Sequence, residues 1–261
     1  MEKPALDNNS GDAGGKKVFL LYPHSVIQEK MLDILIMNGF ETYTLHDYKK
    51  AFKVLRQFPD SIMFVNIDEG LPEKDWETYI RGIQSSPATQ QARLGILSYN
   101  HDRELMAKYL MDIAVPCGYV QLKLGLQEST SIILNVLNVN EARGRRKHIR
   151  AFCEDGIYAT LNFKDDSGFY QGRILDISAA GLAVKVSNFP EIPEKAVLRN
   201  VQLKLHGALV MTDMILMGKR RDDKNVLILL FDPAKLDQDN KLTIHHFIKQ
   251  NLQSFIDKLN V

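Results

Sequence analysis

The chain has 261 residues, 45% of them hydrophobic and 25% charged, which is typical of a globular protein with one large domain or two ordinary ones. The formal net charge of +1 excludes a protein that coats nucleic acid with its whole surface, but it allows a local basic patch. No apolar run reaches the roughly 18 to 20 residues that a bilayer-spanning helix needs. The two cysteines, Cys117 and Cys153, lie far apart and form neither a disulfide framework nor a zinc-binding spacing. We therefore expect a cytoplasmic protein without a structural metal.

Residues 1–15 form a polar segment rich in glycine, asparagine and aspartate. Such a segment cannot bury enough apolar surface to fold, so we expect a disordered tail. It also lacks the apolar core of a secretory signal, which agrees with a cytoplasmic location.

Residues 16–141 alternate short apolar runs with amphipathic ones. Asp47 is suited to cap a helix at its start, and Asn38-Gly39 is suited to end the helix before it. Five strand-helix repeats predict an α/β domain with a five-stranded parallel sheet and helices on both of its faces. The expected strands are 16–23, 41–46, 61–67, 93–99 and 117–123, and the expected helices are 26–40, 47–58, 72–84, 101–114 and 126–142.

These strand-helix units resemble the receiver domain of response regulators, and Ser98 and Lys123 match two residue types of the receiver active site. An active receiver also needs an acidic pair after its first strand, because Mg²⁺ prefers carboxylate oxygens. The stretch 22–25 has no acid, and the phospho-acceptor position carries Asn66, or Asp68 if the strand is longer. We therefore expect a degenerate receiver that phosphorylation does not switch. The competing hypothesis is a phosphorelay output protein that is phosphorylated at Asp68.

After Arg150 the pattern changes to strands with close turns, and residues 165–168, Asp-Asp-Ser-Gly, are typical of a hairpin turn. About six strands predict a small antiparallel β-barrel, so that residues 152–261 form a second, all-β domain with a C-terminal helix. The apolar face of that helix, at 239–259, either covers the barrel or pairs with another chain. The expected strands are 152–163, 169–178, 181–187, 197–207, 208–220 and 226–232, and the expected helix face consists of Ile244, Ile248, Leu252, Phe255 and Leu259.

Residues 142–151 form a basic linker between the two halves, with four arginines and one lysine. By itself this composition favours a solvated charge run or a patch that binds nucleic acid. The linker also carries a pattern, however, because residues 146–150 have the form RxxxR directly before the first barrel strand. Farther along, residues 176–181 have the form DxSxxG and join two strands.

The two motifs together resemble the signature of PilZ domains, which are bacterial receptors for cyclic di-GMP. The resemblance covers about residues 143–256, and both motifs are intact. It implies a non-enzymatic effector that binds cyclic di-GMP and regulates a protein partner in motility, adhesion or virulence. The ligand-binding residues that it implies are Arg146 and Arg150, with Arg145 as an adjacent support, and Asp176, Ser178 and Gly181 on the turn.

The chemistry of these residue types suits this ligand. A guanidinium group donates paired hydrogen bonds to O6 and N7 of guanine, or to phosphate oxygens. Asp176 can accept from the N1–H and amine of guanine, Ser178 can bond a base or the backbone, and Gly181 would permit a tight turn and a close ligand. The DxSxxG segment would also serve as a plain turn between strands.

We predict that ligand binding orders a mobile linker, closes Arg146 and Arg150 on a rigid turn and changes the angle between the halves. Nucleic-acid binding through residues 142–150 is the alternative function. Aromatic residues for base stacking are not interleaved with this basic run, which counts against that alternative.

Overall fold

The computed structural model describes residues 14–23, 25–153, 158–165, 168–186 and 192–259. Most of the predicted tail, residues 1–13, therefore lies outside the described residues. The chain divides into two compact units, Met1–Lys147 with Leu259–Val261, and His148–Lys258. The boundary between them falls inside the basic segment 142–151.

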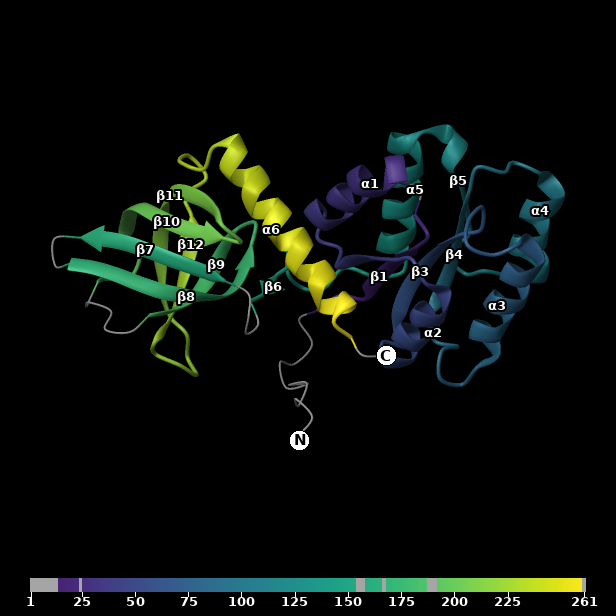
Figure 1. The fold of residues 1–261 in the computed structure, drawn as a ribbon, viewed down its shortest axis with the longest axis horizontal. Helices are drawn as coiled ribbons and strands as arrows, with labels where there is room; N and C mark the ends of the chain where they lie inside the picture. The colour runs from purple at the N-terminus through teal and green to yellow at the C-terminus, as the bar shows by residue number, and fades with distance from the viewer. Residues whose placement is uncertain (1–13, 24, 154–157, 166–167, 187–191, 260–261) are drawn as a thin grey trace. The chain divides into compact units, whose positions relative to one another are not determined.

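The first unit is built on a five-stranded parallel sheet in the order β2-β1-β3-β4-β5, with helices on both faces (Figure 1). This arrangement confirms the predicted receiver-like α/β fold. Its elements are β1 (Lys17–Leu21), α1 (Ser25–Met37), β2 (Thr42–Leu45), α2 (Tyr48–Gln57), β3 (Ser61–Asn66), α3 (Glu73–Ser85), β4 (Arg93–Ser98), α4 (Arg103–Ala107), β5 (Tyr119–Gln121) and α5 (Leu126–Val139).

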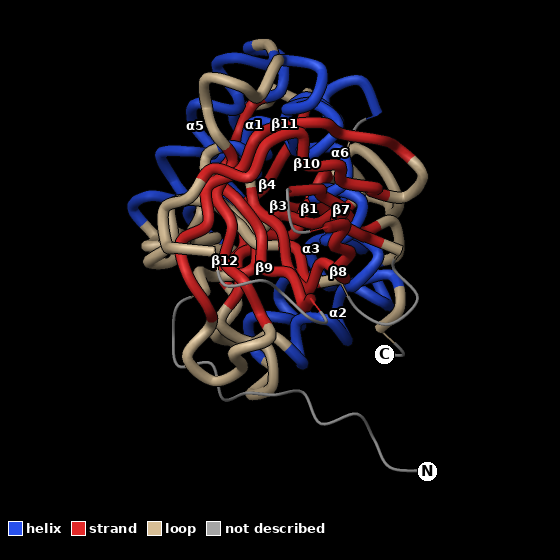
Figure 2. The backbone as a smooth tube through the Cα atoms, turned by 90° about the vertical axis from the view of Figure 1, so that its left-hand side faces the viewer, coloured by secondary structure: helices blue, strands red, loops and turns tan. Residues whose placement is uncertain are grey.

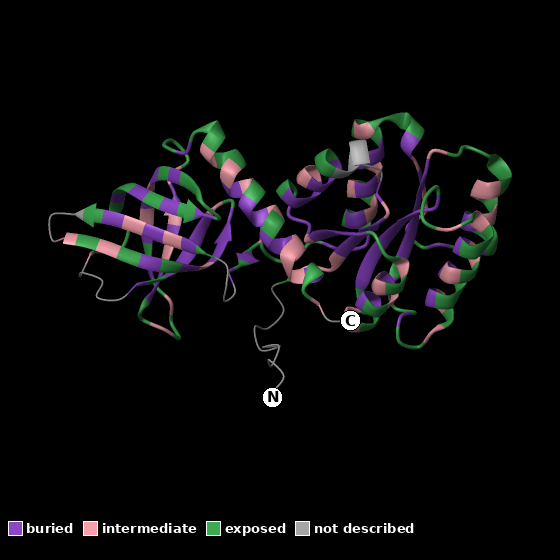
Figure 3. Ribbon diagram, in the orientation of Figure 1, coloured by how far each residue is buried: buried purple, intermediate pink, exposed green. Residues whose placement is uncertain are grey.

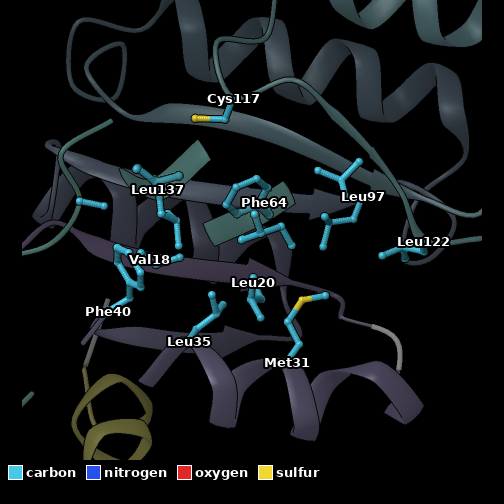
Figure 4. Packing of buried hydrophobic residues seen from close by; sticks show 14 residues of the cluster. Val18, Leu20, Met31, Leu35, Phe40, Phe64, Leu97, Cys117, Leu122 and Leu137 are labelled. Carbon is cyan, nitrogen blue, oxygen red and sulfur yellow. The ribbon is translucent and has the colours of Figure 1, made fainter. Parts of the chain in front are cut away.

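Both faces of this sheet are buried, as a parallel sheet between helices requires. Val18 and Leu20 of β1 belong to a core cluster with side chains of α1 and α5, and Phe64 of β3 fills its centre (Figure 4). The alternate residues of β1, Phe19 and Leu21, point to the opposite face and are also fully buried. Nearly every strand residue of this unit is accordingly buried in Figure 3.

The helix expected at 101–114 differs from the structure, where α4 ends at Ala107 and a π-helical turn, η1 (Lys108–Asp112), follows. The turn is anchored by Tyr109, whose ring is fully buried and whose hydroxyl donates to Glu73 Oε1 at 3.3 Å. The fifth strand is also shorter than expected, because a 3₁₀ turn, η2 (Leu122–Leu124), begins directly after Gln121.

The second unit is a closed antiparallel barrel (Figure 2). Its seven strands pair in the order β6-β8-β7-β10-β11-β12-β9, and a further β8–β9 pairing closes six of them into a ring, with β6 added beside β8. The predicted six-stranded barrel is thereby confirmed. The strands are β6 (Ala151–Phe152), β7 (Ala159–Asp165), β8 (Gly168–Ser178), β9 (Gly181–Val186), β10 (Val197–Leu205), β11 (Ala208–Lys219) and β12 (Val226–Phe231).

The first barrel strand differs from its prediction, because the segment 152–163 contributes to two strands, β6 and β7, and residues 154–157 between them lie outside the described residues. The hairpin expected at 165–168 is confirmed, since Asp165 pairs with Gly168 between β7 and β8.

Helix α6 (Gln238–Asp257) contacts β6, β8 and β11 with its apolar face, so this face covers the barrel. Asp237 caps it by accepting from the Asn240 amide at 2.7 Å. Within the part of the chain that the structure describes, no helix is long and apolar enough to cross a membrane. The buried residues of α6 are Ile244, Phe247, Ile248, Asn251, Leu252 and Ile256, while Phe255 and Leu259 are half-buried.

Candidate functional site

The DxSxxG segment forms the tight connection between β8 and β9, whose last and first residues, Ser178 and Gly181, are paired. Ser178 is almost fully buried, and its Oγ donates to the Gly181 carbonyl at 3.1 Å and accepts from the Ala180 amide at 3.3 Å. The hydroxyl of Ser178 therefore closes the turn from within.

Gly181 is required by the neighbouring strand β12. A Cβ atom at this position would lie 2.1 Å from the Leu229 carbonyl oxygen and 2.9 Å from Leu230 Cα. No side chain fits at that separation, so glycine allows β9 to pair closely with β12. A role for Gly181 in admitting a ligand stays a prediction.

Asp176 points away from the barrel interior because of a bulge in β8. Ile174 pairs with Val184, whereas Asp176 pairs with Ala183, so the register shifts at Leu175 between them. Without the bulge Ile174 and Asp176 would share a face; with it, the apolar side chain enters the core and the carboxylate faces outward.

Arg150 meets this carboxylate. Its Nη1 lies 3.5 Å from Asp176 Oδ1, and the side chains are 40% and 9% exposed, respectively. The second arginine of RxxxR and the aspartate of DxSxxG thus form an ion pair, although they come from segments distant in sequence. The nearly buried carboxylate offers hydrogen-bond acceptors, and the accessible guanidinium beside it offers donors. The two groups can therefore bind adjacent atoms along one edge of a ligand.

Phe152 is a residue that the sequence pattern did not indicate. In the short β6–β8 pairing it lies directly opposite Asp176, and its side chain is 63% exposed. Directly opposed residues of an antiparallel pair project from the same face of the sheet. An exposed aromatic ring therefore stands beside the carboxylate, where a planar base could stack on it.

Cys153 lies behind the site and is buried. Burial raises the pKa of its thiol to about 11, with a smaller contribution in the same direction from the charge of Asp176. The thiol is therefore uncharged at neutral pH and is unsuited to act as a nucleophile. Asn251 of α6 donates to the sulfur at 3.6 Å, and Arg173 donates to the Cys153 carbonyl at 3.4 Å.

The remaining arginines of the predicted site belong to the first unit. Arg145 and Arg146 are exposed on the segment that ends this unit at Lys147. The barrel unit itself therefore brings together Arg150, Asp176, Ser178 and Gly181, and the other two predicted residues come from a different structural unit.

Asn66 ends β3 of the receiver-like unit, and Asp68 follows two residues later. Asp68, which follows β3, accepts hydrogen bonds from Ser98 Oγ at 2.5 Å and from the Tyr99 amide at 2.6 Å. Asn66 donates to the Tyr22 carbonyl at 2.8 Å and accepts from the Asp68 amide at 3.1 Å. Protein donors thus bind both carboxylate oxygens of Asp68.

Lys123 does not lie at a strand end, as the sequence predicted, but in the 3₁₀ turn η2, where its Nζ is 3.3 Å from His101 Nδ1. His24, in the stretch that lacks an acidic pair, is outside the described residues. Among the described residues, no three His, Cys, Asp or Glu side chains group in a way that could hold a metal ion.

No protein-family model matches the chain, and no curated protein matches its sequence. Solved structures do match, and they match the two halves separately. The barrel half is similar to the PilZ domain with c-di-GMP of YcgR from Escherichia coli, with 16% identity over 44% of this chain and 96% of that chain, and a TM-score of 0.37.

The barrel half is also similar to the MrkH–c-di-GMP complex of K. pneumonia, with 20% identity over 40% of this chain and a TM-score of 0.34. The match spans 51% of that chain, about half of its length. The other half is similar to a signal receiver domain of an HD domain-containing protein from Pseudomonas fluorescens Pf-5, with 17% identity, 48% and 97% coverage, and a TM-score of 0.40.

Proposed function

We propose that this protein binds cyclic di-GMP on the outer face of its barrel, at Asp176 and the arginines of the RxxxR motif. The contact between Arg150 and Asp176 carries the proposal, because it joins the two motifs at 3.5 Å. Either motif alone is a common pattern, a charge run or a turn. A ligand site built from both motifs requires their side chains to lie together on one outward face of the barrel.

The pair offers complementary chemistry to a guanine base. The Asp176 carboxylate accepts hydrogen bonds from N1–H and the exocyclic amine, while a guanidinium donates to O6 and N7 on the adjacent edge. Phe152 adds an exposed ring on the same face for stacking. Arg146, with Arg145 as support, supplies positive charge for the two phosphodiester groups of the ligand.

Titration calorimetry with cyclic di-GMP tests this proposal. We expect micromolar or tighter binding by the wild type and a loss of binding in the double variant Arg146→Ala, Arg150→Ala. Arg199→Ala is a matched control, since Arg199 is another exposed arginine of the barrel unit, on β10. Absence of binding by the wild type, or equal binding by the double variant, contradicts the proposal.

We further propose that binding couples the two units and regulates a downstream protein, with no catalytic step. Arg146 lies in the first unit, which ends at Lys147, and Arg150 lies in the second, which begins at His148. A ligand that engages both arginines would therefore constrain how the units move. The ligand can shift the equilibrium between two arrangements of the units only by as much as its affinities for those two arrangements differ. Small-angle scattering should show a more compact or more uniform particle with ligand, and superimposable profiles would contradict this coupling.

A further inference from the structure

The first half of the basic segment lies against the receiver-like unit. Ala142 is 1% exposed, its amide donates to the Leu137 carbonyl at 2.9 Å, and its carbonyl accepts from the Lys16 amide at 2.9 Å. The segment thus leaves α5 along the chain that enters β1, and backbone hydrogen bonds fix its start.

A glycine on each side of the segment allows it to lie this close. A Cβ atom on Gly15 would be 2.3 Å from the Ala142 carbonyl oxygen and 2.5 Å from the Gly144 amide nitrogen. A Cβ atom on Gly39, which has a φ of +84°, would be 2.8 Å from the Lys147 carbonyl oxygen. Real Cβ atoms essentially never approach backbone atoms so closely.

Arg143 adds a side-chain contact between these two points. Its guanidinium carbon lies 5.1 Å from the centroid of the Phe40 ring, a cation–π distance. Gly15-Lys16 and Gly39-Phe40 therefore form a seat for residues 142–147, while Arg145 and Arg146 on the same segment stay exposed.

We propose that the receiver-like unit is a positioning platform for Arg145 and Arg146, and that Gly15, Gly39 and Arg143 are its positioning residues. The inference rests on the proposed cyclic di-GMP function and gives the first unit a task that needs no phosphorylation. Because these contacts hold the segment in place, Arg146 is positioned before the ligand binds. Less backbone entropy is then lost on binding, and the affinity is higher than for a free linker.

Two matched pairs of variants test the seat in the full-length protein. Gly15→Ala is compared with Gly14→Ala, because a Cβ on Gly14 has nothing within 4 Å. Gly39→Ala is compared with Gly118→Ala, because Gly118 has a similar φ of +75° and open space. Both members of the second pair have the same kind of backbone strain, and they differ in that a Cβ on Gly39 would meet Lys147 and Arg143 of the segment.

We expect Gly15→Ala and Gly39→Ala to raise the dissociation constant for cyclic di-GMP about tenfold, the loss expected when roughly one more residue must be ordered. Gly14→Ala and Gly118→Ala should bind as the wild type does. None of these changes removes a charge or touches the barrel. Equal affinities within both pairs, with wild-type binding intact, would overturn the platform and leave the proposed function standing.

Limited trypsin digestion without ligand gives a second readout that does not depend on cyclic di-GMP. Cleavage after Arg143, Arg145, Arg146 and Lys147 should be faster in Gly15→Ala and Gly39→Ala than in their control variants, because a displaced segment enters the protease active site more readily. If the wild type fails to bind cyclic di-GMP, the proposed function fails while digestion still decides whether the seat exists. Identical digestion across each pair refutes the seat.

Discussion

Asp176 faces outward from the barrel because of one extra residue in its strand, Leu175. This orientation brings a nearly buried carboxylate to an arginine that is 40% exposed. Since the arginine remains in contact with water, solvent screens the pair and its contribution to stability is small. We therefore expect Arg150→Ala to change the free energy of unfolding little, whereas the proposed function predicts a large loss of cyclic di-GMP affinity in the same variant.

At the same scale, Phe152 provides a sharp test of where the base lies. Stacking a base on an aromatic ring is worth about 1–3 kcal/mol, so Phe152→Ala should raise the dissociation constant for cyclic di-GMP by about fivefold or more. Phe169→Ala is the control, since Phe169 is 66% exposed near the far end of β8. If calorimetry finds the same loss of cyclic di-GMP affinity in both variants, Phe152 does not stack on a base of the ligand.

At the scale of elements, the pairing of β9 with β12 explains Gly181 better than ligand access does. Adding a methyl group 2.1 Å from the Leu229 carbonyl forces the two strands apart. We expect Gly181→Ala to destabilise the barrel by about 1–3 kcal/mol, as overpacking commonly does. Chemical denaturation followed by circular dichroism measures this loss. A fully stable variant that fails only to bind ligand would instead assign Gly181 to the site.

The edge of the receiver-like sheet makes a second prediction at this scale. Ser98 and the Tyr99 amide already bind both oxygens of Asp68, and the stretch after β1 has no acidic pair for Mg²⁺. We expect acetyl phosphate with Mg²⁺ to leave the intact mass unchanged. An added mass of about 80 Da that disappears in Asp68→Asn would establish the phosphorelay alternative, since that is the mass one phosphoryl group adds.

Elements whose structure depends on residues close in sequence could be predicted from the sequence. Asp47 accepts from the amides of Lys49 and Lys50, which is the cap expected from its place before a helix. The π turn at η1 was not predictable in this way, because it depends on the burial of Tyr109 and its bond to distant Glu73. The divided first barrel strand likewise depends on which neighbour each half finds in the folded barrel.

The candidate site likewise combines residues that a local sequence pattern indicates with residues that only the folded structure reveals. Arg150, Asp176 and Ser178 could be named from the sequence because each of their motifs is contiguous, and their place in a ligand site stays a prediction. Phe152 could not be named in this way, because its place follows from the register between β6 and β8, which no local pattern encodes. The spacing of RxxxR also gave no sign that Arg146 and Arg150 belong to different compact units.

At the scale of the whole molecule, the two units need not share a rigid interface for one to influence the other. The sequence predicted a mobile linker over residues 142–150. Residues 142–147 contact the receiver-like unit, to which they belong, and Ala151 pairs with Ile177 in the barrel. The mobility of the linker stays a prediction. Only His148, Ile149 and Arg150 lie between the two attached stretches.

In the proposed ligand site, the length of this connection would set the effective concentration of Arg146 at the barrel. A spacer of a few residues keeps a tethered group in the millimolar range or above, and that concentration falls roughly as the −3/2 power of spacer length. Inserting about ten glycine and serine residues after Lys147 should therefore weaken cyclic di-GMP binding by about ninefold, with every ligand-contacting side chain intact. If the affinity for cyclic di-GMP falls when only the spacer length changes, the length of the chain between the units helps to set the concentration of second messenger to which the protein responds.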